Sequence, residues 1–282
     1  MKVFIPADVP TNQHKTFADN YCAITKNTQK LLLFAADQKI EHLNTDFYGP
    51  GIDQAANDPR HIFAIAHQGH AGALATQLGL IARHSAQYLG INYIVKLNSR
   101  TNIGPSDQDP ISQLLWTIED VVTFKQASSL AIRGVGYTLY LGSEHEATML
   151  AQAAQIINHA HRHGLLAILW VYPRGKFIKE QTAELFIGSA GAAHALGADF
   201  VKLHMAPHSN FDAITLAAQA AGNTKILCAG GAHTESTKFL QTTHNQLQHG
   251  AAGIAVGRNL FQRPLPEAIA LSKKLAALIY EN

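Results

Sequence analysis

The chain has 282 residues, of which 47% are hydrophobic, only 15% are charged and 16 are histidines, with a formal net charge of +2. A domain takes roughly 100–200 residues, so this length suits two domains or one large α/β barrel, and the hydrophobic content excludes disorder. The 22 basic and 20 acidic residues nearly balance, and the basic residues form no run. The sequence therefore gives no sign of a basic surface that would bind nucleic acid or an anionic membrane.

The first thirty residues predict an N-terminal extension with a short helix over 16–27. Pro6 and Pro10 interrupt this start before any apolar run, which is unlike a signal peptide, and no apolar stretch approaches the ~18 residues that span a bilayer. Cys22 and Cys228 are too few for a disulfide framework. We therefore expect a soluble cytoplasmic protein, and the low share of charge predicts a large closed core or a homo-oligomer.

From residue 31 onward, short apolar runs alternate with longer amphipathic segments. Several runs are nearly continuous in aliphatic and aromatic residues, which is typical of parallel strands covered on both faces. The strands are expected over 31–36, 72–76, 93–98, 134–142, 165–172, 199–205, 224–231 and 252–257.

Helices are expected between these strands. The clearest covers 143–164, where Ser143 and Glu146 have the spacing of a capping box and Gly164 marks the end. Eight strands that alternate with helices predict one (β/α)₈ TIM barrel over residues 31–282. An open doubly wound sheet is the alternative, but eight strands favour closure. Further helices are expected over 179–196, 212–222, 234–249 and 265–280.

Lys202 stands inside an apolar strand, ADFVKLHM. Chemistry in a barrel is located where strands end, and a buried lysine has a lowered pKa and can attack a carbonyl carbon to form a Schiff base. A lysine paired with a carboxylate inside the barrel explains the pattern equally well. Lys96, in YIVKLN, is either a rival nucleophile or a second positive charge that lowers the pKa of Lys202.

Trp170 and Tyr172 stand two apart on the strand before Lys202, so they face the same way. If this face is the barrel interior, the Tyr172 hydroxyl comes near the amine, where a phenol can relay a proton. Aromatic packing is the simpler explanation of an isolated W-x-Y pattern.

Glycines follow the seventh and eighth strands, at Gly230 and Gly231 and at Gly257, and Arg258 comes next. Backbone N–H groups at glycines can approach an anion closely, and barrels frequently bind phosphate at this position. Arginine adds a fixed fork for phosphate oxygens. Glycines also serve as plain turns, but two such strand ends, one followed by arginine, favour a phosphate site.

The histidines are mostly expected at surfaces and helix ends. His159, His161 and His163 crowd the last turn of the helix over 143–164, where imidazolium is favoured by the helix dipole. His159 and His163 are four apart, as metal ligands can be, but no carboxylate lies between them. We expect no metal and no cofactor.

Taken together, these segments resemble the archaeal-type class I fructose-bisphosphate aldolases, a family related to deoxyribose-phosphate aldolase. The most specific elements are W-x-Y-P-R-G, G-A-D-F-V-K and A-V-G-R-N. The matching segments run in order along almost the whole chain: FAADQKIEH (34–42), ATQLGLIAR (75–83), VKLNSRTN (95–102), GVGYTLYLGSEHEATML (134–150), ILWVYPRG (168–175), GADFVKL (197–203), CAGGAHT (228–234) and GAAGIAVGRNLFQR (250–263).

The resemblance implies a metal-independent aldolase acting on a phosphorylated sugar, most simply one that cleaves fructose 1,6-bisphosphate to dihydroxyacetone phosphate and glyceraldehyde 3-phosphate. It matches Lys202 to the Schiff-base lysine, Tyr172 to the proton-transfer tyrosine and Asp37 to a catalytic aspartate. The residues expected to bind substrate are Trp170, Lys96, Arg174, Gly230, Gly231, Gly257 and Arg258.

Two substrate-facing loops depart from the family pattern. Many members read Asp-His-Gly after the first strand, whereas this chain has Asp-Gln-Lys at 37–39, and HMAPHSN (204–210), with His204 and His208, replaces a segment that often contains glycine. The substrate is therefore less defined than the chemistry. The alternatives are an aldolase for tagatose bisphosphate or deoxyribose phosphate, a transaldolase-like enzyme, or a non-catalytic barrel that binds sugar phosphates.

Overall fold

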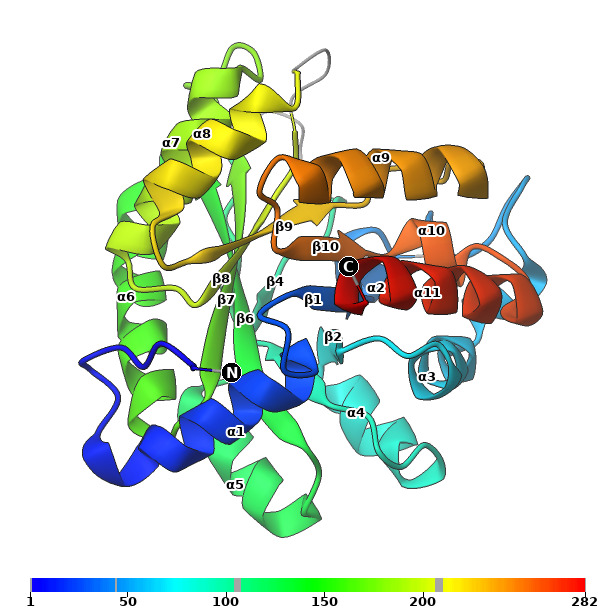
Figure 1. The fold of residues 1–282 in the computed structure, drawn as a ribbon, viewed down its shortest axis with the longest axis horizontal. Coiled ribbons are helices and arrows are strands. Elements are labelled where there is room, and N and C mark those ends of the chain that lie inside the picture. The colour runs from blue at the N-terminus through cyan, green and yellow to red at the C-terminus, as the bar shows by residue number, and fades with distance from the viewer. Residues whose placement is uncertain (1, 44, 104–107, 206–209, 282) are drawn as a thin grey trace.

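The computed structural model describes residues 2–43, 45–103, 108–205 and 210–281. Eight parallel strands close into a barrel in the order β1-β10-β9-β8-β7-β6-β3-β2, so the predicted TIM barrel is confirmed (Figure 1). The strands are β1 (Leu31–Ala35), β2 (Ala73–Gln77), β3 (Tyr93–Lys96), β6 (Ile132–Leu141), β7 (Leu166–Pro173), β8 (Phe200–Leu203), β9 (Lys225–Ala229) and β10 (Gly253–Val256).

Helices surround the barrel and follow the predicted alternation. They are α1 (His14–Thr25), α2 (Gln38–Glu41), α3 (Pro59–Gln68), α4 (Leu78–His84), α5 (Ile118–Ser128), α6 (Glu146–Arg162), α7 (Ala183–Ala195), α8 (Asp212–Ala221), α9 (Ser236–Gln248), α10 (Arg258–Phe261) and α11 (Leu265–Tyr280). Within the described residues, no helix is long and apolar enough to cross a membrane.

The helix expected over 143–164 begins later than predicted. α6 starts at Glu146, and its N-cap is His145, which makes no side-chain capping bond. The Ser143 hydroxyl instead donates to the carbonyl of Pro110 at 2.7 Å, and the Glu146 carboxylate accepts from the N–H of Gly142. The two residues therefore fix the turn after β6, and the predicted capping box is wrong.

The interior of the barrel is a continuous apolar column that begins at α1. Phe17, Tyr21 and Ile24 of this helix belong to one buried cluster with the inward-facing strand residues, and the cluster extends as far as Trp170. The Tyr21 ring stacks on Phe200 with centroids 5.5 Å apart. The N-terminal extension thus covers the amino end of the barrel, and α1 crosses beneath the strands in Figure 1.

The polar segment after β3 lies over the carboxyl end of the barrel. It contains β4 (Asn98–Ser99) and β5 (Gln113–Leu114), which pair antiparallel. Asn98 is fully buried and ties the segment to β6, because its side chain donates to Thr138 O at 2.8 Å and accepts from Thr138 N at 2.7 Å. Of the two barrel ends, this carboxyl end therefore carries the polar loops.

His161 departs from the expectation for the histidines. Its ring is fully buried, with Nδ1 2.8 Å from an Asp8 carboxylate oxygen and Nε2 3.2 Å from one of Asp199. Burial lowers the pKa of His161, but the hydrogen bonds and charges of the two carboxylates outweigh it and raise the pKa to about 9. His159 and His163 are exposed near the end of α6, as predicted.

Candidate active site

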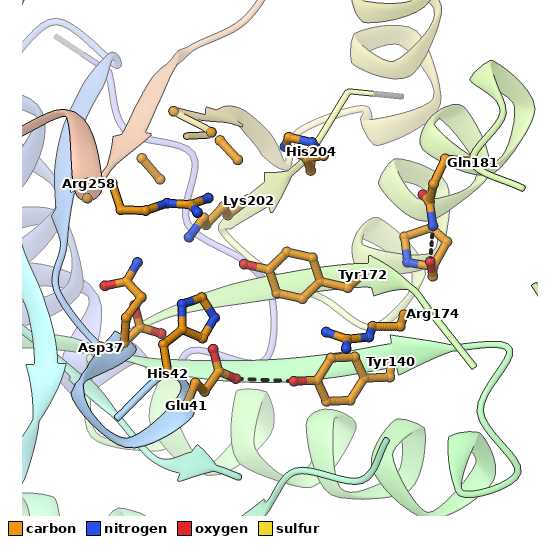
Figure 2. A pocket seen from close by; sticks show the side chains of 17 residues that line it. Asp37, Glu41, His42, Tyr140, Tyr172, Arg174, Gln181, Lys202, His204 and Arg258 are labelled. Atoms are coloured by element: carbon orange, nitrogen blue, oxygen red, sulfur yellow. Dashed lines mark hydrogen bonds between the residues drawn. The ribbon is translucent and has the colours of Figure 1, made fainter. Parts of the chain in front are cut away.

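A cavity of about 360 Å³ opens at the carboxyl end of the barrel (Figure 2). Its walls come from the ends of β1, β6, β7, β8, β9 and β10 and the loops that follow them, as expected where parallel strands end. Eight of the ten residues predicted from the sequence line it: Asp37, Tyr172, Arg174, Lys202, Gly230, Gly231, Gly257 and Arg258.

Lys202 reaches this cavity from β8 and is only 6% exposed. Burial lowers the pKa of its amine, whereas the charges of Asp37 and Glu41 raise it and that of Arg258 lowers it. The net direction is downward, so a larger fraction of the amine is unprotonated than for a lysine in water. The unprotonated amine is the form that attacks a carbonyl carbon.

Tyr172 faces the same space from the end of β7, and its hydroxyl points toward Lys202 in Figure 2. Burial raises the pKa of this phenol well above its usual value, and the charges of Glu41 and Asp37 raise it further. The Tyr140 ring lies against the Tyr172 ring with centroids 6.1 Å apart. Tyr172 is therefore a neutral, protonated phenol in this structure.

Asp37 follows β1 and is the N-cap residue of α2. Gln77, at the end of β2, holds its backbone carbonyl with a hydrogen bond of 2.7 Å. The carboxylate oxygen Oδ1 is buried and has no hydrogen-bond partner among the described residues. A buried acceptor without a partner is costly, so this oxygen is available to a substrate hydroxyl or to the charge that develops at Lys202.

The two glycine-containing strand ends are tied together by Asn259, which is fully buried. Its side-chain amide donates to Gly230 O at 2.9 Å and to Ala232 O at 2.8 Å. Gly257 cannot carry a side chain, because a Cβ there would lie 2.7 Å from Ala35 O. The backbone is thus bare where it borders the cavity, as an anion site built from N–H groups requires.

Arg258 extends from the start of α10 into the cavity. Its Nε lies 3.9 Å from a carboxylate oxygen of Asp46, and the same carboxylate is 2.5 Å from Nδ1 of His42. The hydrogen bond to Asp46 raises the pKa of His42 more than burial lowers it. Asp46 therefore orients two basic groups at the edge of the cavity.

Lys96 and Trp170 do not line the cavity, in contrast to the sequence prediction. Lys96 is buried, and its amine donates to the backbone and side-chain oxygens of Asn98, both at 2.9 Å. Both amines lie over the Trp170 ring, with Lys96 Nζ 5.4 Å and Lys202 Nζ 5.6 Å from the ring centroid. A Cβ at Gly136 would lie 2.5 Å from this ring, so the small residue makes room for it. Both side chains are therefore buried in the barrel interior near Lys202 and do not face the cavity.

The comparison with known proteins agrees with this geometry. Residues 31–263 match the family described as DeoC/LacD family aldolase. The chain belongs to the DeoC/LacD aldolase family. Among curated relatives, the fructose-bisphosphate aldolase/6-deoxy-5-ketofructose 1-phosphate synthase of Methanocaldococcus jannaschii is 46% identical over 99% of this chain and 91% of its own. The class 1 fructose-bisphosphate aldolase of Halobacterium salinarum is 32% identical over 90% and 91%.

Solved structures of the family superpose on the whole barrel. A fructose-bisphosphate aldolase from Slackia heliotrinireducens has a TM-score of 0.96 at 46% identity, covering 99% of this chain and 90% of its own. An archaeal fructose-1,6-bisphosphate aldolase, whose catalytic lysine is covalently bound to a carbinolamine intermediate of the substrate, has a TM-score of 0.80 at 29% identity over 94% and 99%.

Several lining residues of this aldolase-family site carry no role in the sequence prediction: Glu41, His42, Tyr140, Gln181 and His204. Glu41 and His42 were recognisable as polar residues just after the first strand, and His204 as the last polar residue of the sixth. Tyr140 gave no signal of its own inside the apolar run GVGYTLYLG. Burial, Lys202 and Arg258 lower the pKa of His204, and His208 lies outside the described residues.

Within the described part of the chain, no group of three or more His, Cys, Asp and Glu side chains could hold a metal ion. His159 and His163, which have metal-ligand spacing, are exposed near the end of α6, away from the cavity lining. Besides two imidazoles and two carboxamides, the side chains that do line the cavity offer an amine, two phenols, two carboxylates and two guanidinium groups: Lys202, Tyr172, Tyr140, Asp37, Glu41, Arg174 and Arg258. This set suits covalent amine catalysis on an anionic, hydroxylated substrate.

Proposed function

We propose that this chain is a class I fructose-bisphosphate aldolase, which interconverts fructose 1,6-bisphosphate with dihydroxyacetone phosphate and glyceraldehyde 3-phosphate through a Schiff base on Lys202. The observation that carries the proposal is a buried lysine of lowered pKa in a cavity that also holds a protonated phenol and a bare glycine backbone with an arginine. The names of the relatives at 32–46% identity support the substrate.

The first stage joins the substrate to the enzyme. The free amine of Lys202 attacks the ketone carbon, the carbonyl oxygen leaves as water after protonation, and an iminium ion remains. This cation carries a fixed positive charge where the neutral amine stood. Asp37 and Glu41, whose charges already act on Lys202, stabilise the iminium electrostatically.

Cleavage then uses the iminium as the electron sink. The electron pair of the bond between C3 and C4 moves toward the C=N⁺ group and forms a neutral enamine, while the C4 hydroxyl loses its proton and becomes the aldehyde. Once the neighbouring iminium cation has lowered the pKa of Tyr172 and the phenol proton has passed to solvent, the Tyr172 phenolate is placed to take the proton of the C4 hydroxyl and to return it to C3 of the enamine. Water then hydrolyses the restored iminium and frees Lys202.

Arg258 and the N–H groups around Gly230, Gly231 and Gly257 are proposed to hold the phosphate of the ketone half. Anchoring this end fixes the carbonyl carbon against Lys202 and turns a bimolecular attack into an intramolecular one. The relative from Methanocaldococcus jannaschii also carries the name 6-deoxy-5-ketofructose 1-phosphate synthase. A lysine imine can form the carbon–carbon bond of such a synthesis equally well, so this second activity is a further candidate.

The test is a coupled assay of cleavage on fructose 1,6-bisphosphate, tagatose 1,6-bisphosphate and deoxyribose 5-phosphate. We expect the wild type to cleave fructose 1,6-bisphosphate best, Lys202→Met to lose all measurable turnover, and Lys238→Met, on the exposed face of α9, to keep it. A wild type that binds these substrates without cleaving any, or a Lys202→Met variant that turns over normally, would contradict the proposal.

We also propose that the protein is a cytoplasmic homo-oligomer. Only 15% of its residues are charged, and large apolar side chains such as Phe4, Leu89 and Phe177 are 61%, 69% and 68% exposed on the single chain. Sedimentation velocity should give a mass that is a multiple of one chain. A single monomeric species at micromolar concentration would be inconsistent with this part of the proposal.

A further inference from the structure

The polar groups of the cavity follow an order that suggests how a substrate lies in it. Figure 2 shows Arg258 beside Lys202, the Tyr172 hydroxyl next to Lys202, and the Arg174 guanidinium between the Tyr172 and Tyr140 rings, with Glu41 and Tyr140 along one side. The two guanidinium groups thus stand apart on either side of Tyr172 in this view, and Glu41 with Tyr140 forms an acidic and phenolic wall beside them. A chain with an anionic group at each end and hydroxyls in the middle matches this order.

Glu41 belongs to this wall, but neither the proposed catalytic steps nor the proposed phosphate site places it in direct contact with the substrate. The Tyr140 hydroxyl donates to Glu41 Oε1 at 3.1 Å, and Tyr140 is held against Tyr172 on the neighbouring strand. Among the described residues, the side-chain hydrogen bonds of Glu41 involve Oε1 alone, and no cationic side chain forms an ion pair with it within 4.0 Å. One carboxylate oxygen is therefore left for a ligand.

A carboxylate that faces a cavity accepts hydrogen bonds and donates none. It repels phosphate and cannot bond to a carbonyl oxygen, so its partner must carry an N–H or O–H group. Lys202, Arg174 and Arg258 share the cavity and disfavour a cationic ligand. The remaining partner is a neutral hydroxyl.

The position of the pair indicates which hydroxyl it meets. Tyr140 and Tyr172 are register partners on β6 and β7, and neighbouring strands lie roughly 4.8 Å apart. Tyr140 is thus one strand further from Lys202, on β8, than Tyr172 is. If Tyr172 meets the hydroxyl on the carbon where the bond breaks, Glu41 meets the hydroxyl on the next carbon along the chain.

We propose that Glu41, oriented by Tyr140, forms a subsite that selects aldehydes with a hydroxyl group on the carbon next to the carbonyl carbon. This inference rests on the aldolase function proposed above and names the acceptor class of that site. Glu41 contacts the substrate as a specificity residue, and Tyr140 is a positioning residue that acts through Glu41. An aldehyde without this hydroxyl gives the Glu41 carboxylate no hydrogen-bond donor, which raises the free energy of the transition state for that aldehyde.

The experiment measures condensation of dihydroxyacetone phosphate with two aldehydes, glyceraldehyde 3-phosphate and 3-phosphooxypropanal, which lacks only the α-hydroxyl. The wild type should prefer the hydroxylated aldehyde in kcat/KM by about 10- to 100-fold, the range of a hydrogen bond to a charged group. Glu41→Met should lower kcat/KM with both aldehydes, because the charge of Glu41 also acts on Lys202, and should lower it further with the hydroxylated aldehyde, so that the preference falls to within about threefold. Tyr140→Phe should reduce it in part.

The matched control is Tyr137→Phe, because Tyr137 lies on the same strand but donates to Gln152 at 2.9 Å, outside the cavity lining. It should keep the full preference. Equal loss with both aldehydes in Glu41→Met, or an unchanged preference, would overturn the inference, since a merely structural residue affects both substrates alike. Failure of the aldolase function is a separate outcome: the wild type would then condense neither aldehyde, whereas an active wild type without preference contradicts only the subsite.

Discussion

Lys202 is surrounded by groups that act on its proton in opposite directions. Burial lowers the pKa of the amine and Arg258 lowers it further, while Asp37 and Glu41 raise it. The carboxylates oppose loss of the proton from the ammonium form of Lys202, but they also stabilise the iminium ion that later replaces it, because this ion carries its positive charge at the same place. The arrangement therefore places the negative charge that stabilises the iminium ion beside the amine before the reaction begins.

The first prediction concerns Tyr172. Because this phenol is proposed to move the proton during cleavage but not to form the imine, Tyr172→Phe should lower kcat by about 100- to 10,000-fold and leave imine formation intact. Steady-state cleavage rates and the mass of the borohydride-reduced protein give the two readouts. A kcat within threefold of wild type would exclude Tyr172 from proton transfer.

The second prediction concerns Lys96, whose amine, like that of Lys202, lies over the Trp170 ring. Burial lowers the pKa of Lys96, and the charge of Lys202 lowers it as well. Because repulsion between like charges acts on both groups, we expect a protonated Lys96 to disfavour protonation of Lys202 in turn. Lys96→Met should therefore let Lys202 keep its proton to higher pH. The midpoint of the pH profile of imine trapping should rise, with slower trapping at pH 7 that recovers on the alkaline side.

Lys125→Met is the matched control, because Lys125 is a half-buried lysine on α5, outside the cavity lining. Its pH profile should overlay that of the wild type. A midpoint that stays constant or falls in Lys96→Met would mean that Lys96 serves only to hold Asn98 and the loop after β3.

Among the elements, the N-terminal segment and α1 have a role that the alternation of strands and helices does not reveal. α1 covers the amino end of the barrel, and Asp8 of the preceding segment reaches His161 at the end of α6. His161 also holds Asp199 at the start of β8, whose carboxylate accepts from Ala167 N at 2.8 Å. One buried imidazole thus joins three parts of the chain that lie far apart in sequence.

The third prediction follows from the pKa of His161, which is about 9 in the folded chain and near 6.5 in an unfolded one. A raised pKa adds stability that is complete below pH 6.5 and is lost as the pH rises through 9. The free energy of unfolding should fall by roughly 3 kcal/mol over this window. Urea unfolding followed by circular dichroism at a series of pH values measures it.

His161→Gln should be less stable than wild type at pH 6 and should lose most of this pH dependence. His159→Gln is the matched control, since His159 is exposed two residues earlier on the same helix, and its profile should follow the wild type. A wild type whose stability is constant from pH 6.5 to 9 would show that His161 is not protonated in the folded state.

At the scale of the whole molecule, the barrel could be predicted because each of its elements has a local signature. Apolar runs mark strands that are covered on both faces, and glycines end the helices, so no long-range contact is needed to count eight units. The reactive residues at strand ends, such as Lys202 and Arg258, could be predicted from the sequence for the same reason. Strand position alone brings them to one end of a closed barrel.

What could not be predicted depends on contacts between residues far apart in the chain. The sequence shows that Lys96 and Trp170 face the interior, but their depth below the cavity depends on how neighbouring strands are staggered. Glu41 and Tyr140 are 99 positions apart and meet only because α2 folds over the end of β6. The low charge of the chain, 15%, makes such buried polar pairs conspicuous once the fold is known.

The central claim is that Lys202 forms the covalent intermediate, and reductive trapping tests it most directly. The protein is treated with borohydride in the presence of dihydroxyacetone phosphate, digested and mapped by mass spectrometry. The account predicts one adduct, on the peptide that contains Lys202, which is absent in Lys202→Met. An adduct on the Lys96 peptide alone, or no adduct from an enzyme that cleaves its substrate, would contradict it.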